Sequence, residues 1–114
     1  NKGRKFRRLV KSAAESADLV VVVGSAAGEL NQELKNSEKV EALIAVEAAR
    51  DFLQGILRDG DLVLLKGLLA DHLERLAWVR TTEVGCWRAR CRRNIQCSAC
   101  DLMRQPAGKD DCLP

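Results

Sequence analysis

The stretch Leu19-Val20-Val21-Val22-Val23-Gly24 decides the fold class of this chain. Its apolar positions run without a polar interruption, and β-branched residues of this kind are enriched in strands. A strand that is apolar on both faces is typical of the centre of a parallel sheet, covered by helices on each side. The run is too short to cross a bilayer, because a membrane-spanning helix needs about 20 apolar residues. The sequence therefore predicts an α/β fold with no membrane span.

Helical patterns flank this strand. Residues 3–17 place apolar side chains at helical spacing, with most Lys and Arg side chains on the opposite face. After the strand we expect a short helix over Ser25–Leu34, with Ser25 as its N-cap. A long amphipathic helix is predicted over Glu38–Arg58, and residues 68–79 favour a closing helix.

A second apolar run, Leu62–Leu65, follows a turn at residues 59–61 and is predicted to be a second strand. Strand, helix and strand in this order form a parallel crossover, which is right-handed in nearly all proteins. Because a stable parallel sheet usually has more than two strands, we expect the chain to lack an N-terminal strand or two of its native domain. The first residue, Asn1, is consistent with such a truncation.

Charge and cysteine are unevenly distributed along the 114 residues. The net charge of +3 combines a basic segment at residues 1–11, an acidic middle and a second basic segment at residues 80–104. Aromatic residues make up only 4%, which leaves few surfaces on which unpaired bases can stack, so nucleic acid is not expected as a partner. All cysteines lie between residues 86 and 112. We therefore predict an α/β domain over residues 1–80 and a Cys-rich, basic tail over residues 81–114.

The cysteine spacing predicts a metal site in this tail. Cys86-x4-Cys91 is followed by Cys97-x2-Cys100, and the second pair has the spacing of a zinc knuckle. Structural zinc held by these thiolates is the favoured interpretation. Thiols without a metal, disulfides and an iron–sulfur cluster are the alternatives. Cys112 is expected to be spare. Basic residues between Cys86 and Cys97 are placed to offset the charge of the thiolates: Arg88, Arg90, Arg92 and Arg93.

Two glycine turns are candidate binding sites. Gly24 and Ser25 follow the first predicted strand, where exposed amides can hold an anion. The three-glycine fingerprint is absent, so a tight turn is favoured over an anion site there. In the second turn, Lys66 and Gly67 follow the strand that Asp61 opens. Open α/β sheets bind ligands at the carboxyl ends of their strands. Two interpretations of Lys66 are therefore equally supported: a contact with a carboxylate or phosphate of a ligand, and a solvated strand end.

The single histidine, His72, is interpreted as a polar helix position and not as a general base. No serine, cysteine or carboxylate is spaced to work with it, and no paired carboxylates or nucleophile arrangement occurs elsewhere. The chain is therefore not predicted to be an enzyme by itself.

The element Gly60-Asp61-Leu62-Val63-Leu64-Leu65-Lys66-Gly67, with Ala17–Gly24 before it and Asp71–Arg75 after it, resembles the C-terminal domain of the Mur ligases over residues 3–79. The resemblance implies a Rossmann-like domain that binds an incoming amino acid or dipeptide amine, with Asp61, Lys66 and Gly67 at the site. It also implies a cytoplasmic, ATP-dependent amide ligase of cell-wall or surface-polymer synthesis.

The sequence departs from the family pattern at one informative position, since Leu68 stands where the family has a serine. The family's ATP loop and Mg²⁺ ligands belong to other domains of the parent protein, so ATP and Mg²⁺ are expected only there. The first functional hypothesis is thus the substrate-binding portion of a Mur-type ligase. The alternatives are a zinc-knuckle module that contacts nucleic acid or a protein partner, and an α/β interaction domain without a ligand.

Overall fold

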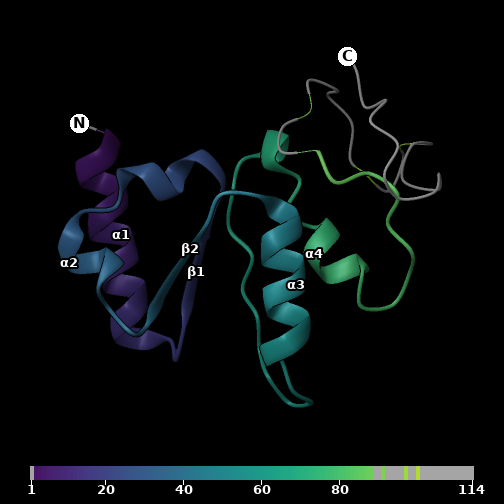
Figure 1. Cartoon of the computed structure of the whole chain (residues 1–114), viewed down its shortest axis with the longest axis horizontal. Helices are drawn as coiled ribbons and strands as arrows, with labels where there is room; N and C mark the ends of the chain where they lie inside the picture. Colours follow the sequence, from purple (N-terminus) through teal and green to yellow (C-terminus); the bar gives the residue numbers. More distant parts are fainter. Residues whose placement is uncertain (1, 89–90, 92–96, 98–99, 101–114) are drawn as a thin grey trace. The chain divides into compact units, whose positions relative to one another are not determined.

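The computed structural model describes residues 2–88 together with Cys91, Cys97 and Cys100 (Figure 1). Its residues form two compact units, Asn1–Ala49 (unit 1) and Arg50–Pro114 (unit 2), and each is described by itself below. The described elements are helices and one small parallel sheet, so the chain belongs to the mixed α/β class. The predicted division after residue 80 stays a prediction.

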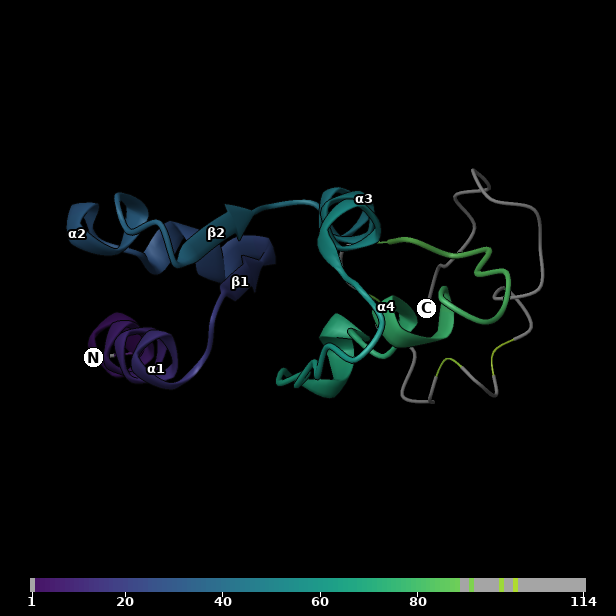
Figure 2. The ribbon, with the colours of Figure 1, turned by 90° about the horizontal axis from the view of Figure 1, so that it is seen from below.

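Unit 1 is built around a two-stranded parallel sheet. Its elements in chain order are α1 (Lys2–Ser16), β1 (Val20–Val23), the 3-10 helix η1 (Gly24–Glu29), α2 (Gln32–Lys35) and β2 (Val40–Leu43). Val20 pairs with Val40 and Val23 with Leu43, and η1 and α2 form the crossover between the strands. Helix α1 packs against β1, on one side of the sheet (Figure 2).

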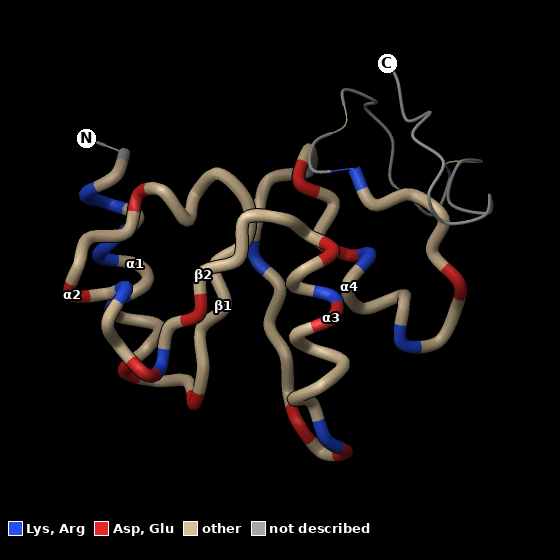
Figure 3. The backbone as a smooth tube through the Cα atoms, in the orientation of Figure 1, with Lys and Arg blue, Asp and Glu red and all other residues tan. Residues whose placement is uncertain are grey.

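The core of unit 1 explains the amphipathic pattern of α1. The apolar stripe of the helix faces the sheet, and its Lys and Arg residues lie between Lys2 and Lys11 (Figure 3). The buried side chains of this core are Val10, Val22, Ala27, Leu30, Leu34 and Val40. Two predictions are thereby confirmed: the helix over residues 3–17, shifted by one residue, and a strand of a parallel sheet in the valine run.

The predicted helix over Glu38–Arg58 is wrong in its first part. Val40–Leu43 is strand β2, and α3 begins only at Val46 and ends at Ile56. A four-residue apolar segment fits both a strand and the first turn of a helix, and periodicity alone does not separate them. Pairing with β1 decides the outcome, because a strand must satisfy its backbone groups through a neighbouring strand.

The predicted helix over Ser25–Leu34 is also corrected, since the segment divides into η1 and α2. Gly24 has a φ of +86°, Val23 precedes η1, and Ser25 does not cap it. The cap that does form belongs to α2: the side chain of Asn31 accepts a hydrogen bond from the amide of Leu34 at 3.0 Å. A new cap inside the segment breaks the single helix in two.

The predicted strand Leu62–Leu65 does not form, and the segment has no regular secondary structure. Leu62 is 97% exposed and Leu64 88% exposed, so this run is not a buried strand. Within the described residues β1 has a single partner, β2, and is therefore not central in its sheet. An apolar run becomes a strand only where another strand pairs with it, and the sequence does not reveal which of two runs pairs with β1.

Unit 2 contains most of α3, followed by the 3-10 helix η2 (Leu69–Asp71) and α4 (Arg75–Trp78). The predicted closing helix over residues 68–79 is thus two short helices with a break at His72 and Leu73. Unit 2 has a Cys-rich core whose buried residues are Val84, Cys86, Cys97 and Cys100. Trp78, Val79, Trp87 and Cys91 pack against this core. None of the described helices is long and apolar enough to cross a membrane.

Candidate metal centre

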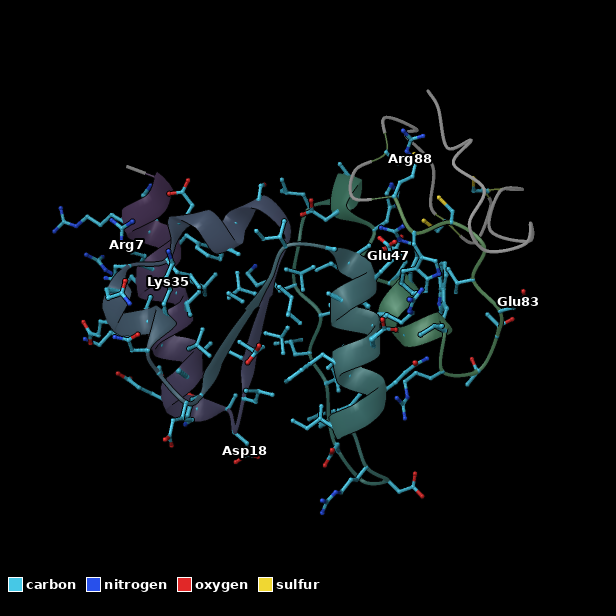
Figure 4. All side chains as sticks on the ribbon, viewed as in Figure 1. Arg7, Asp18, Lys35, Glu47, Glu83 and Arg88 are labelled. Atoms are coloured by element: carbon cyan, nitrogen blue, oxygen red, sulfur yellow. The ribbon has the colours of Figure 1, made fainter. Side chains whose placement is uncertain are left out.

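The thiols of four cysteines between residues 86 and 100 lie in or against the core of unit 2. Cys86, Cys97 and Cys100 are buried, and Cys91 is half-buried against the same cluster. None of these four cysteines is in a disulfide. The amide of Cys100 donates to the carbonyl of Cys97 at 3.0 Å, which holds the two cysteines of this pair together. Figure 4 draws the sulfur atoms of the described cysteines in yellow. The cysteines chosen from their spacing therefore lie in one cluster.

His72 and Glu74 extend this cluster. Ligand atoms of His72, Glu74 and Cys97 all lie within 4.8 Å of one another, an arrangement that can hold a metal ion. His72 is 2% exposed, and its Nδ1 lies 3.0 Å from Oε1 of Glu74. Its second ring nitrogen, Nε2, is buried and has no hydrogen-bond partner among the described residues. A buried polar atom without a partner is costly, and a metal ion is one way to satisfy it.

The electrostatics of this group favour a protonated thiol in the metal-free chain. Burial and the negative charge of Glu74 raise the pKa of Cys97 to about 12, and Arg75 opposes this shift only in part. Burial also works against ionisation of Glu74. Hydrogen bonds from its own backbone and from His72 and Cys97 outweigh burial and hold the pKa of Glu74 below its usual value. In the metal-free chain Glu74 is therefore the anion of the group.

Arg75 fixes the frame around these side chains. It is 2% exposed, and its guanidinium donates to four backbone carbonyls of unit 2. Nε reaches the carbonyl of His72 at 2.9 Å, and Nη1 reaches that of Cys86 at 2.9 Å. Nη2 reaches the carbonyls of Asp71 at 3.2 Å and Arg88 at 2.8 Å. One side chain thus joins the turn that carries His72 to the segment that carries Cys86.

Trp87 is held beside this frame. Its Nε1 donates to the carbonyl of Val84 at 3.0 Å. The guanidinium carbon of Arg50 lies 4.8 Å from its ring centroid, and that of Arg75 lies 5.7 Å away. Cation–π contacts of this kind fix the orientation of an indole ring. Trp87 is therefore a structural part of the cluster.

The other predicted site residues lie outside this cluster. Gly24 and Ser25 belong to unit 1, where Gly24 makes the positive-φ turn after β1 and Ser25 is exposed. In unit 2, the carboxylate of Asp61 accepts from the amide of Arg58 at 2.9 Å and so closes its own turn.

Lys66 and Gly67 are exposed, and they follow no strand. A Cβ atom at Gly67 would lie 2.8 Å from Cδ1 of Leu73, so packing is one reason for the glycine. The expected placement of Lys66 at the end of a buried strand is therefore wrong, because that strand does not form. Arg90, Arg92, Arg93 and Cys112 lie outside the described residues.

Sequence reasoning missed His72, Glu74 and Arg75. The interpretation of His72 as a polar helix position is wrong, because the residue is buried between two short helices with a φ of +46°. A usable signal was present all the same. The single histidine of a chain with clustered cysteines is a natural zinc ligand, since Cys₃His sets are common in structural sites.

Comparison with known proteins gives no relative: no protein-family model, curated protein or solved structure matches this chain. The chemistry of the cluster is therefore the basis on which a function is proposed.

Proposed function

We propose that unit 2 is a zinc-binding module in which the metal has a structural role. The observation that carries the proposal is the burial of Cys86, Cys97 and Cys100 in one core, with His72 and Glu74 beside Cys97. Thiolate and imidazole are the ligands that Zn²⁺ prefers in proteins, whereas Mg²⁺ and Ca²⁺ prefer oxygen. The presence of an imidazole in the group favours zinc over an iron–sulfur cluster, which is usually held by thiolates alone.

Burial supports a structural role over a catalytic one. A catalytic zinc keeps one coordination position open to water or substrate, whereas a structural zinc is enclosed by protein ligands. The three cysteines here are each less than 10% exposed, as is His72. Among the described residues after α3, the helices are η2 and α4, with three and four residues, so a metal cross-link would supply order that short helices cannot.

Metal titration tests the proposal. The full chain, purified metal-free under reducing conditions, is titrated with Zn²⁺, and bound metal is measured after gel filtration. We expect one tightly bound zinc per chain and a higher Tm with zinc, because a ligand that binds only the folded state stabilises it. Cys97→Ser should lose both effects, and Cys112→Ser, at the cysteine predicted to be spare, should keep both. A wild-type chain that retains no zinc contradicts the proposal.

The ligase role stays a prediction from the sequence. Within the Mur ligases the pattern is nearest to the UDP-N-acetylmuramoyl-tripeptide–D-alanyl-D-alanine ligase, so D-alanyl-D-alanine is the first amine to titrate. Binding that Lys66→Ala abolishes and Lys35→Ala leaves intact would support this role, since both lysines are exposed and only Lys66 belongs to the family element. The described hydrogen bond of Asp61 closes its own turn and Gly67 lies close to Leu73, so neither residue adds support.

A further inference from the structure

We propose that His72 is a metal ligand through Nε2, completing a Cys₃His set with Cys86, Cys97 and Cys100, and that Glu74 orients its imidazole. The inference rests on the proposed zinc module and names the ligands of that site. It exchanges one of the cysteines predicted from spacing, Cys91, for the histidine.

The state of the imidazole supports this assignment. Nδ1 lies 3.0 Å from Oε1 of Glu74, and a carboxylate oxygen accepts hydrogen bonds, so this contact is made by the tautomer in which Nδ1–H is the donor. In that tautomer Nε2 has a lone pair and no proton. Nε2 is also the one buried side-chain nitrogen or oxygen without a hydrogen-bond partner in the described part of the chain. A zinc-bound histidine has this pattern, with one nitrogen on the metal and the other on a carboxylate.

The backbone holds His72 in place for this role. Its φ of +46° lies in the left-handed region, which residues with a side chain seldom occupy and which is concentrated at functional sites. The carbonyl of His72 accepts from Nε of Arg75 at 2.9 Å. Nη1 of the same guanidinium binds the carbonyl of Cys86, so Arg75 ties the proposed imidazole ligand to a proposed thiolate ligand.

Charge balance favours three thiolates over four. Zn²⁺ with four thiolates carries a charge of −2, and with three thiolates and a neutral imidazole it carries −1. Arg75 is the one buried basic side chain in the described ranges, and it supplies a single positive charge beside Cys86. Glu74 adds one negative charge to either set, so with Arg75 present the Cys₃His set leaves less uncompensated charge than four thiolates do, and uncompensated buried charge is costly.

Burial separates Cys91 from the other cysteines. Cys86, Cys97 and Cys100 belong to the buried core of the cluster, whereas Cys91 is half-buried and packs on its outside. Ligands of a structural zinc enclose the metal from all sides and are therefore buried themselves. Cys91 is thus the cysteine that the imidazole replaces.

Nitrogen NMR of the intact chain tests the assignment without any substitution. The full chain, ¹⁵N-labelled and free of an affinity tag, is loaded with ¹¹³Cd²⁺ in place of Zn²⁺. His72 is the single histidine, so both imidazole resonances belong to it. We expect a one-bond ¹¹³Cd–¹⁵N coupling at Nε2 and none at Nδ1. Bound cadmium with both nitrogens uncoupled overturns the inference and leaves the zinc module standing. A chain that binds neither Zn²⁺ nor Cd²⁺ overturns both.

Two matched variants give a second measurement. His72→Asn suits the left-handed backbone, because asparagine tolerates positive φ better than most residues. It should weaken zinc binding by more than the ~10–100-fold that loss of an outer-shell partner costs. Cys91→Ser should bind zinc as the wild type does. Equal affinity of His72→Asn and wild type, or loss of zinc in Cys91→Ser, contradicts the ligand set.

The role of Glu74 is tested by Glu74→Gln. Because Glu74 is a positioning residue, its replacement should weaken zinc binding by roughly 10–100-fold. The coupling of Nε2 to ¹¹³Cd should persist, since the imidazole still binds the metal, while the Nδ1 resonance should shift with its changed hydrogen bond. An unchanged Nδ1 resonance contradicts the orienting role.

Discussion

The replacement Arg75→Met removes the guanidinium that joins the His72 turn to the Cys86 segment. Methionine keeps much of the length and apolar volume of the side chain but donates no hydrogen bond. The carbonyl of Cys86 then loses a buried donor at 2.9 Å. The carbonyl of His72 keeps only the backbone amide of residue 75, at 3.3 Å. The carbonyls of Asp71 and Arg88 are half-buried, so water can replace part of what they lose.

These bonds set the size of the effect. A buried carbonyl left without a donor costs about 1–3 kcal/mol, and each of the other three bonds contributes about 0.5–1.5 kcal/mol net. Folding the variant no longer requires the guanidinium to leave water, which offsets part of this loss. We therefore expect the free energy of unfolding to fall by about 3 kcal/mol, a large share of the roughly 5–15 kcal/mol that is typical of a domain.

Urea unfolding of the metal-free chain measures the change. Both tryptophans, Trp78 and Trp87, belong to unit 2, so tryptophan fluorescence follows this unit alone. With an m-value of about 1–3 kcal/mol per M, a loss of this size lowers the midpoint by about 1 M or more. Arg80→Met is the matched control, because Arg80 is exposed and its replacement should change stability by no more than about 0.5 kcal/mol.

Equal urea midpoints of Arg75→Met and Arg80→Met would contradict this role of Arg75. Arg75→Lys separates charge from geometry. Lysine keeps the positive charge but has three donors on one nitrogen, which cannot reach four carbonyls on two segments. We expect its midpoint to lie between those of wild type and Arg75→Met. A lysine variant as stable as wild type would show that the positive charge matters and the several donors of the guanidinium do not.

Three further predictions concern titration and unit 1. Because the folded chain raises the pKa of Cys97 from 9.0 to about 12, the neutral thiol stabilises the metal-free fold below pH 9, and this contribution should be lost as pH rises from 9 to 12. Urea midpoints across that range should fall, and less steeply in Cys97→Ala. Asn31→Ala removes the cap of α2 and should cost about 1 kcal/mol in thermal unfolding, with no such loss in Gln32→Ala. Val22→Ala should cost about 2 kcal/mol by chemical unfolding, because Val22 is buried, and Val21→Ala, at a half-buried position, should cost less.

In unit 1 the sequence was informative where a pattern was long or unambiguous. The helix over residues 3–17 has four turns of consistent spacing, and the valine run has no helical alternative of comparable strength. Val40–Leu43 was missed because its apolar residues also continue the stripe of α3. The choice between Val40–Leu43 and Leu62–Leu65 as partner of β1 depends on tertiary pairing, which local composition does not contain.

In unit 2 the cysteine cluster was predictable and the rest of the group was not. Two residues separate Cys97 from Cys100 in the sequence, so the short distance between them follows from spacing alone. His72 lies far from them in sequence, and the bonds of Arg75 join its turn to the segment of Cys86. In the sequence, Arg75 looks like an ordinary basic residue of a helix. The left-handed backbone of His72 has no sequence signal either, since glycine and asparagine are the residues typical of such a turn.

The bonds of Arg75 have a consequence for how the proposed zinc site forms. Its four acceptors are backbone carbonyls, so the guanidinium binds them whether or not a metal is present. The turn of His72 and the segment of Cys86 are therefore joined before zinc arrives, unlike a zinc finger that is unfolded without its metal. Zinc then has to displace the proton of Cys97 and bind thiolates around a frame that already exists. Preorganisation of this kind reduces the ordering cost of binding. It follows that Arg75→Met should weaken zinc binding although Arg75 touches no metal, because the variant must fold the frame and bind the ion together.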